Sequence, residues 1–392
     1  MANREQITEP SSIHVIHVTE DFSANGGGVY TSLIELARNS LRLGLKQSIF
    51  TPDPAKTPID LEEIVFSFQT TAFGKPWRHS LNLTKQLAKI ANQAETIIHI
   101  HGAWMSPQLL AGKISRTLQT PCIISPHNML GSWFWRQGMA RNIKKSLYWN
   151  LLSKKAFERH ALMHALTQFE AQRIKELLPK NRIEVIPNAI DIGDVDNEIN
   201  KHHKSHNFHD SFGDYFLFLG RLHPVKGIEI LLDAYSSLPK KGRPQLVIAG
   251  PPHSSNYLSH LRSYISKLDI EQQVSIIGPV DSSIKWTLLK SARAVCAPSF
   301  SEGMSMVALE AMAAKVPLIT TYEAGIHDVS EGGGYLVTPT QESIRFALSE
   351  AMQWEDRERV DRGLAARRLV ERSYSWQIVG TKWKQLYSEV NQ

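Results

Sequence analysis

The sequence has few cysteines and no long apolar segment. Two of the 392 residues are cysteine, Cys122 and Cys296, and both lie in apolar, strand-like runs. This pattern predicts small buried side chains in a reducing compartment and excludes a disulfide-rich scaffold. No apolar run approaches the roughly 20 residues that span a bilayer, and residues 1–12 lack the apolar core of a signal peptide. We therefore expect a cytoplasmic protein that at most binds the inner face of a membrane peripherally.

The chain also lacks a large charge imbalance and the common nucleotide motifs. Its net charge is +6 and its hydrophobic content is 42%, as in a globular protein that binds anionic ligands. The basic residues do not interleave with surface aromatics on a recognised module, so no nucleic acid partner is expected. The glycines at 26–28 fit neither the GxGxxG pattern nor a Walker loop. No ligand spacing predicts a bound metal, and no lysine stands in a setting typical of a pyridoxal phosphate Schiff base.

Strands alternate with helices along the whole chain. A length of 392 residues exceeds one ordinary core and predicts two domains. Alternation of this kind indicates parallel sheets, so we expect an α/β protein of two doubly wound, Rossmann-like domains that face a cleft. The predicted parts are a first domain over 1–195, a polar linker over 196–213, a second domain over 214–374, and a helix over 375–392 that crosses back to the first domain.

In the second half, charged side chains follow two predicted strands. Glu302 lies on the loop after the strand at 294–298, and Glu310 lies about two turns into the next helix. Arg221 and Lys226 lie on the loop at 220–227, where cations can hold a diphosphate. Backbone N–H groups at the helix start add partial positive charge. This pattern favours a ligand with anionic groups and many hydroxyls, such as a nucleotide sugar; an ordinary turn with two solvated glutamates is the alternative.

In the first half, a glycine loop and two histidines end predicted strands. Gly27 and Gly28 stand between a strand and a helix, the arrangement of a phosphate-binding loop. His101 and His127 end the strands at 96–102 and 121–127, on the same edge, and Trp104 follows His101. A flexible turn and two structural histidines are the alternative interpretation, and both stay open.

The segment 136–160 is basic and amphipathic. Apolar residues recur at helical spacing among seven cations, with Glu158 as the acid. The pattern fits an ordinary surface helix, and it also fits contact with anionic lipid or a lipid-linked substrate.

Taken together, these loops resemble those of the retaining glycosyltransferases of the GT-B fold, in the large family 4 group. The resemblance covers nearly the whole chain, and six landmarks appear in the family's order: 27–29, 99–102, 125–130, 185–188, 220–227 and 302–310. A narrower similarity, to bacterial exopolysaccharide-type members, depends mainly on 125–130 and the basic segment.

The resemblance implies a role for each position. Arg221 and Lys226 would hold the donor diphosphate, and Glu310 would bind the ribose hydroxyls. Glu302 would read the sugar hydroxyls, and His127 would lie beside the reacting carbon. The remaining donor contacts would come from Gly27, Gly28, Gly303, Met304, Ser305, Met306 and the main chain near Val280. His101 and Trp104 are weaker candidates for the acceptor side. Ser305 stands where many members have glycine, and Pro251-Pro252 stands where an acid is common.

The predicted function is therefore a retaining, metal-independent transfer of a hexose from a nucleoside-diphosphate sugar, with UDP-glucose as the leading donor and no cofactor. The acceptor would be a saccharide or a lipid-linked saccharide in polysaccharide biosynthesis. The first domain would take the acceptor and the second would bind the donor. Two alternatives remain: a nucleotide-sugar epimerase of the same fold, and a non-catalytic nucleotide-sugar-binding protein at a membrane surface.

Overall fold

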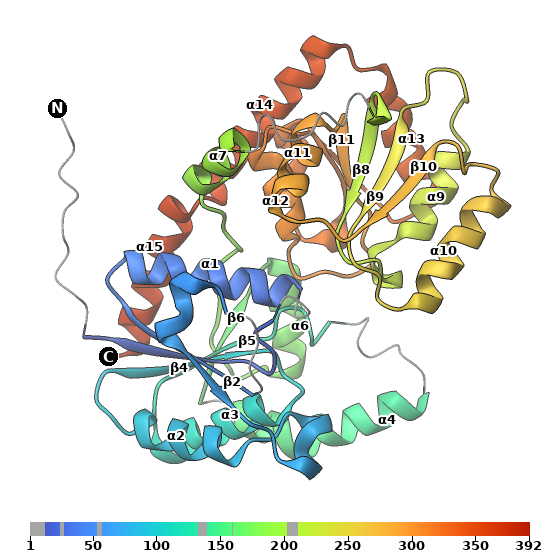
Figure 1. Cartoon of the computed structure of the whole chain (residues 1–392). Coiled ribbons are helices and arrows are strands. Elements are labelled where there is room, and N and C mark those ends of the chain that lie inside the picture. Colours follow the sequence, from blue (N-terminus) through green and yellow to red (C-terminus); the bar gives the residue numbers. More distant parts are fainter. Residues whose placement is uncertain (1–11, 24–26, 53–56, 132–138, 159, 202–210) are drawn as a thin grey trace, which may run out of the picture. The chain divides into compact units, whose positions relative to one another are not determined.

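The structure is a computed structural model that describes residues 12–23, 27–52, 57–131, 139–158, 160–201 and 211–392. The chain forms two compact units (Figure 1). The first comprises Met1–Asn188 and Gln377–Gln392, and the second comprises Ala189–Trp376. The chain therefore leaves the first unit once, builds the second, and returns with its last helix. None of the helices within the described ranges is long and apolar enough to cross a membrane.

The described part of the first unit contains a seven-stranded parallel sheet in the order β3-β2-β1-β4-β5-β6-β7. Its strands are β1 (His14–Val18), β2 (Lys46–Pro52), β3 (Val65–Phe68), β4 (Thr96–His101), β5 (Cys122–Ser125), β6 (Leu162–Ala165) and β7 (Ile183–Val185). Its helices are α1 (Gly28–Arg42), α2 (Leu81–Ala91), α3 (Ser106–Leu118), α4 (Met139–Tyr148), α5 (Lys154–Phe157), α6 (Gln168–Leu177) and α15 (Trp376–Val390), the last of which begins one residue inside the second unit.

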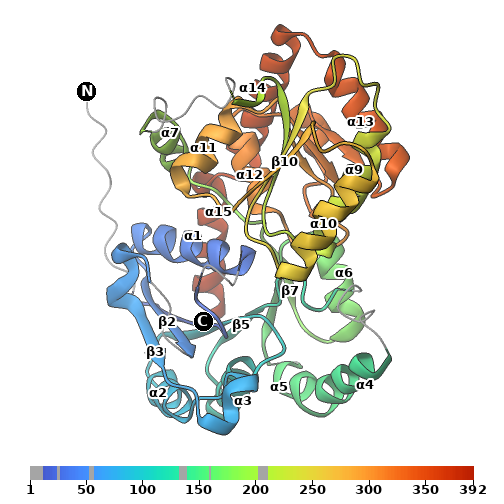
Figure 2. The ribbon, with the colours of Figure 1, turned by 45° about the vertical axis from the view of Figure 1, so that its right-hand side comes forward.

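The two faces of the first sheet differ in polarity. Alternate residues such as Ile98 and Ile100 pack in the apolar core with Leu87 of α2 and Ala111 of α3. The intervening positions of the same strand, His99 and His101, lie on the opposite face, because successive side chains point to opposite sides of a strand. Helices cover both faces (Figure 2), with α1 and α15 on one and α2 and α3 on the other. A sheet covered on both sides explains why its central strands β1, β4, β5 and β6 are buried along their length.

The described part of the second unit contains a six-stranded parallel sheet in the order β10-β9-β8-β11-β12-β13. Its strands are β8 (Tyr215–Leu219), β9 (Gln245–Ala249), β10 (Val274–Gly278), β11 (Ala294–Ala297), β12 (Leu318–Thr321) and β13 (Tyr335–Val337). Its helices are α7 (Ile192–Lys201), α9 (Ile228–Ser236), α10 (Ser255–Lys267), α11 (Ser282–Ser291), α12 (Met306–Ala313), α13 (Gln341–Gln353) and α14 (Asp356–Ser373). The predicted doubly wound sheets are thus present in both halves.

One predicted helix has different bounds in the structure, and another helix is preceded by a short turn. Helix α2 begins at Leu81, because the Ser80 side chain caps it by accepting from the N–H of Leu83, and a short 3₁₀ helix over Ala72–Trp77 precedes it. The expected amphipathic helix over 136–160 is interrupted, since a π-helical turn, Trp149–Ser153, separates α4 from α5. Residues 136–138 and 159 of that segment lie outside the described residues.

The predicted linker over 196–213 begins inside α7. The guanidinium of Arg367 on α14 donates to both carboxylate oxygens of Asp196, at 2.7 and 2.8 Å, and Val195 is buried. This paired attachment makes the first part of the segment an element of the second unit. Residues 202–210 of the predicted linker lie outside the described residues.

Candidate functional site

In each sheet the strand order reverses at one point. The reversal lies between β1 and β4 in the first unit and between β8 and β11 in the second. Ligands of open α/β sheets bind beyond the carboxyl ends of the strands at such switch points. Gly27, Lys226 and Glu302 lie after β1, β8 and β11, and His101 is the last residue of β4, so each sheet presents its predicted residues at its own switch point.

The loops after β8 and β11 are joined by close backbone contact. The N–H of Phe300 donates to the carbonyl of Val225 at 2.8 Å. Gly227 has a positive φ of 69°, and a Cβ on it would come within 2.1 Å of the carbonyl oxygen of Pro298. Only glycine fits there without displacement of the chain. This approach brings the 220–227 loop against the end of β11.

Lys226 and Glu302, predicted on separate loops, form an ion pair. The Lys226 ammonium lies 2.5 Å from Glu302 Oε1, and the Ser299 hydroxyl donates to Oε2 at 2.9 Å. The two side chains are 22% and 18% exposed. A carboxylate held on both oxygens is fixed in orientation, and a phosphate that approaches Lys226 must compete with it. Arg221 stands exposed on the same loop, directly after Gly220.

A second lysine–carboxylate pair involves Glu310, which follows Glu302 closely in the sequence. Glu310 on α12 accepts from Lys285 of α11 at 2.9 Å, and Lys285 also lies 4.4 Å from the centroid of the Trp286 ring. The sequence did not identify Lys285, because no motif surrounds it and its relation to Glu310 depends on how α11 packs. Val280 is partly exposed between β10 and α11.

The start of α12 corrects one expectation. The N–H groups of Gly303, Met304, Ser305 and Met306 were all expected to face a ligand, but the N–H of Ser305 donates to the carbonyl of Ala324 at 3.1 Å. The loop packs so closely that a Cβ on Gly325 would come within 2.4 Å of the Gly303 carbonyl oxygen. The Ser305 hydroxyl caps the helix by accepting from the N–H of Ala308. Ser305 therefore serves the loop's own structure with both groups.

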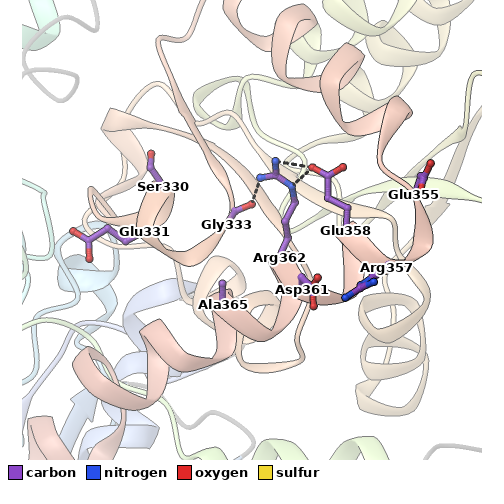
Figure 3. A pocket seen from close by; sticks show the side chains of 9 residues that line it. All are labelled: Ser330, Glu331, Gly333, Glu355, Arg357, Glu358, Asp361, Arg362 and Ala365. Carbon is purple, nitrogen blue, oxygen red and sulfur yellow. Dashed lines mark hydrogen bonds and ion pairs between the residues drawn. The ribbon is translucent and has the colours of Figure 1, made fainter.

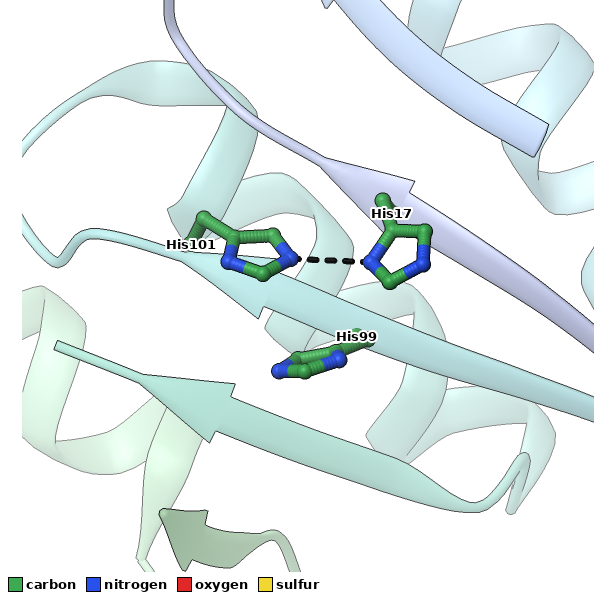
Figure 4. A group of neighbouring side chains, drawn as sticks. All are labelled: His17, His99 and His101. Atoms are coloured by element: carbon green, nitrogen blue, oxygen red, sulfur yellow. Dashed lines mark hydrogen bonds between the residues drawn. The ribbon is translucent and has the colours of Figure 1, made fainter. Parts of the chain in front are cut away.

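In the first unit, His101 and His127 are in direct contact. His101 Nδ1 lies 2.9 Å from His127 Nε2, and His101 Nε2 lies 2.9 Å from Nδ1 of His17, a residue the sequence analysis did not identify (Figure 4). His127 and Asn128 both have positive φ, at 51° and 61°, and the N–H of Asn128 donates to the Glu170 carboxylate at 2.5 Å. Burial, and secondarily His164, lower the pKa of His127 to about 3. The ring is therefore neutral near pH 7.

The nitrogens of His17, His99 and His101 lie within 4.8 Å of one another, as metal donors do. Each ring nitrogen nevertheless has a protein partner. His17 Nε2 lies 2.6 Å from Gln47 Oε1, and His99 bonds to the hydroxyls of Tyr387 at 2.9 Å and Ser125 at 2.7 Å. A metal would have to displace these hydrogen bonds. The prediction of no metal stays a prediction.

The glycine loop and Trp104 are placed near the same edge. Gly27 is the N-cap of α1 with a φ of 60°, and a Cβ on Gly28 would meet no atom of the described residues within 4 Å. Glu20, after β1, is enclosed by protein, and this burial raises its pKa to about 7. The Trp104 indole N–H donates to the carbonyl of Met129 at 2.8 Å, while Lys145 lies 5.7 Å from its ring centroid.

Two family models match the chain. Residues 26–194 match Glycosyltransferase Family 4, and residues 199–368 match Glycosyl transferases group 1. Among solved structures, HepE of Anabaena in complex with UDP and glucose superposes with a TM-score of 0.76 over 96% of this chain and 100% of that chain, at 18% identity. The chain belongs to the GT-B glycosyltransferases.

Curated relatives agree with this assignment. A D-inositol 3-phosphate glycosyltransferase of Jonesia denitrificans is 25% identical over 342 residues, which are 80% of this chain and 79% of that protein. An uncharacterised glycosyltransferase of Methanocaldococcus jannaschii is 31% identical over 218 residues, 53% of this chain and 54% of the relative. The match to the latter thus spans about half its length. The predictions of a GT-B fold and a family 4 relationship are confirmed; the roles of single residues stay predictions.

One further hollow of this glycosyltransferase lies away from the predicted residues. It is lined by residues of α14 and of the turn before β13, including Gly333 and Arg362, whose guanidinium bonds to the Gly333 carbonyl and to Glu358 (Figure 3). Because Gly333 precedes β13, the hollow lies at the amino edge of the sheet, opposite the switch point. Its lining mixes acids and arginines and gives no reason to place the substrate there.

Proposed function

We propose that this GT-B glycosyltransferase is a retaining, metal-independent hexosyltransferase. It moves a sugar from a nucleoside-diphosphate donor, with UDP-glucose first among candidates, to a saccharide or lipid-linked saccharide in polysaccharide biosynthesis. The observation that carries the proposal is the pair of lysine–carboxylate contacts on the loops and helices at the second switch point, Lys226 with Glu302 and Lys285 with Glu310. The solved complex of HepE with UDP and glucose supports the choice of donor.

In this proposal, fixed cations drive the breaking of the sugar–phosphate bond. Negative charge grows on the departing diphosphate, and cations aimed at that position stabilise the transition state more than the ground state. Arg221 and Lys226 stand on the loop after β8 and supply this charge. The main chain of Gly27 and Gly28 would approach the same phosphates, and no atom of the described residues blocks a ligand within 4 Å of a Cβ on Gly28.

The carboxylates would bind the neutral parts of the donor. Glu302 would accept hydrogen bonds from sugar hydroxyls and Glu310 from ribose hydroxyls, because carboxylates are strong acceptors for such groups. The main chain near Val280 would meet the base. His127 would lie beside the sugar, with His101 and Trp104 towards the acceptor. The acceptor's proton would pass to the leaving phosphate.

A lipid-linked acceptor fits the surface of α4 and of the π-helical turn that follows it. Ile143, Leu147 and Leu151 recur at intervals of four and are 56%, 55% and 59% exposed, with Lys144 and Lys154 beside them. A helix with exposed apolar residues and lysines binds anionic bilayer surfaces. We place the enzyme in the cytoplasm at the inner face of the membrane. Co-sedimentation with vesicles rich in phosphatidylglycerol, and its loss in Ile143→Ser/Leu147→Ser, tests this contact.

Thermal unfolding with a panel of nucleotides and nucleotide sugars tests the donor. A ligand that binds the folded state increases the free energy of unfolding, by about 2.7 kcal/mol at a concentration of 100 times its Kd, and so raises the midpoint temperature. We expect a selective shift from one nucleoside diphosphate and its sugar, equal in chelator and in magnesium. Transfer to an acceptor with retained anomeric configuration then supports the full proposal. Isomerisation of the sugar without transfer would establish the epimerase instead, and a shift without turnover on any acceptor would establish a binding protein.

A further inference from the structure

A row of polar side chains crosses the α15-facing side of the first sheet. It runs from Gln47 on β2 through His17 on β1 and His99 and His101 on β4 to Ser125 on β5 and His164 on β6. The strand registers set these residues on one face, since Val15 pairs with Gln47, His17 with His99 and His101 with Ser125. Burial dominates in lowering the pKa of each of these histidines, so the rings are neutral and each carries one N–H.

One branch of this row has a fixed direction. His164 Nε2 lies 2.8 Å from the backbone carbonyl of Ile186, which can only accept, so His164 carries its proton on Nε2. Its Nδ1 must then accept from the Ser125 hydroxyl at 2.7 Å. Ser125 accepts from His99 Nε2–H, and His99 Nδ1 accepts from the Tyr387 hydroxyl. A single acceptor at one end therefore sets the proton position on two imidazoles.

The second branch runs from Gln47 through His17 and His101 to His127, and its end at Gln47 also fixes the proton positions. Gln47 Oε1 lies 2.6 Å from His17 Nε2, a separation that suits an N–H to oxygen bond better than a contact between two nitrogens. His17 then carries its proton on Nε2 and accepts on Nδ1 from His101 Nε2–H. His101 in turn accepts on Nδ1 from His127 Nε2–H. His127 is left with a bare Nδ1.

We propose that Gln47 is a positioning residue that acts through His17 and His101 to hold His127 as the Nε2–H tautomer, with the Nδ1 lone pair available to a substrate hydroxyl. Nδ1 of His127 has no hydrogen-bond partner among the described residues, and His127 is partly exposed at the switch point. Gln47 Nε2 is buried and has no partner in the same part of the chain. If the amide were reversed, each proton along the branch would move to the other nitrogen and His127 would present an N–H.

The proton position has a consequence for substrate choice, which depends on the proposed function. A bare Nδ1 accepts a hydrogen bond from a sugar hydroxyl and repels a carboxylate, whereas Nδ1–H would donate to either. The branch would thus favour a neutral sugar over a uronate at the position that His127 contacts. Specificity of this kind comes from a buried amide that never touches the substrate.

Two-bond ¹H–¹⁵N correlation spectra of the full-length protein with ¹⁵N-histidine test the proton position directly, because they distinguish protonated from bare ring nitrogens. The His127 signals are assigned by their loss in His127→Gln. We expect a protonated Nε2 and a bare Nδ1 on His127 in the unmodified protein, and a shift towards the other tautomer in Gln47→Leu. The matched control is Tyr387→Phe, which removes a buried partner from the other branch and should leave His127 unchanged.

The unmodified protein decides the main point even if Gln47→Leu does not fold. A protonated Nδ1 on His127, or an unchanged His127 tautomer in a folded Gln47→Leu, would overturn the proposal. In transfer assays we expect kcat/KM for the neutral-sugar donor to fall about 2- to 10-fold in Gln47→Leu, the range for one neutral hydrogen bond. A protein without transferase activity would refute the proposed function and still give the spectra, so the two failures are distinguishable.

Discussion

Replacing Glu302 by glutamine should separate nucleotide binding from sugar transfer. In the structure the Lys226 ammonium is already held by Glu302 at 2.5 Å, so a diphosphate must compete with a carboxylate for it. Glutamine keeps the shape and one acceptor oxygen but removes the charge. We therefore expect UDP without a sugar to bind more tightly to Glu302→Gln, while turnover of the nucleotide sugar falls.

The size of both effects follows from the contact. Unit charges 2.5 Å apart attract by roughly 7 kcal/mol at an effective dielectric constant of 20. Desolvation of the two partly buried side chains offsets most of this, which leaves about 1–2 kcal/mol and a 5- to 30-fold gain in UDP affinity. The lost charged hydrogen bond to a sugar hydroxyl costs about 1.5–3 kcal/mol, so kcat/KM should fall about 10- to 150-fold.

Isothermal titration with UDP and initial rates with the identified donor measure the two quantities on the same sample. Glu331→Gln is a matched control, because Glu331 pairs with Arg372 at the opposite edge of the same sheet and should change neither value. A Glu302→Gln protein that loses UDP affinity in parallel with turnover would refute the competition argument. Unchanged UDP affinity would show that breaking the Lys226–Glu302 ion pair requires no free energy when UDP binds.

Three further predictions test other parts of the molecule. Arg221→Ala and Lys226→Ala should each lower kcat by about 100- to 1,000-fold, because each removes one cation that stabilises the transition state. Their circular dichroism spectra should be unchanged. Lys240→Ala, which removes an exposed ion pair, should have a near-normal rate in the same assay. The melting temperature should fall between pH 7 and pH 5, because the imidazoles of buried His17 and His164 and of partly exposed His127 have pKa values lowered to about 4, 4 and 3. The stabilisation from these neutral rings is complete above the unfolded pKa of about 6.5. It is lost on acidification, by about 2 kcal/mol per ring at pH 5. Burial raises the pKa of Glu20 to about 7 and of Glu170 to about 6, so the destabilisation from these carboxylates disappears at low pH and offsets part of the fall in melting temperature. A melting temperature that did not change with pH would contradict the prediction that the histidines outweigh the two glutamates. Gly227→Ala should lower the free energy of unfolding in urea by at least about 2 kcal/mol, and by more than Gly242→Ala. Gly242 has a similar φ of 73°, but a Cβ there would meet no atom of the described residues within 4 Å, so equal losses would contradict the steric argument.

The sequence predicted the architecture because its signals are local. Buried strands, glycine turns and helix patterns each occupy a short window, and parallel sheets place the carboxyl ends of their strands at one edge. For that reason Lys226 and Glu302, 76 residues apart, could be expected at one site before their contact was known. The same reasoning brought His101 and His127 to one edge.

The partners of these residues could not be predicted in the same way. The contact of His99 with Tyr387 joins positions 288 residues apart, and no sequence pattern near either residue predicts the other as its partner. Lys285 and Gln47 have their roles only through the packing of neighbouring elements. The hydrogen bond from Ser305 to Ala324 was missed because a helix start was treated alone, without the loop at 322–325 that covers it. Local patterns locate an edge, whereas tertiary packing decides which polar groups remain open there.

The position of α15 has a consequence for the order in which the protein forms. Trp383 and Tyr387 are buried against His99 and His164 of the first unit, with Trp383 and His164 ring centroids 4.6 Å apart. During synthesis, which proceeds from the amino end, the first unit therefore lacks part of its cover until residues 377–392 have been made. The second unit, encoded between the two pieces, can complete its contacts earlier. Synthesis of residues 377–392, rather than synthesis of the strands that carry the histidines, would then time the burial of the histidine row.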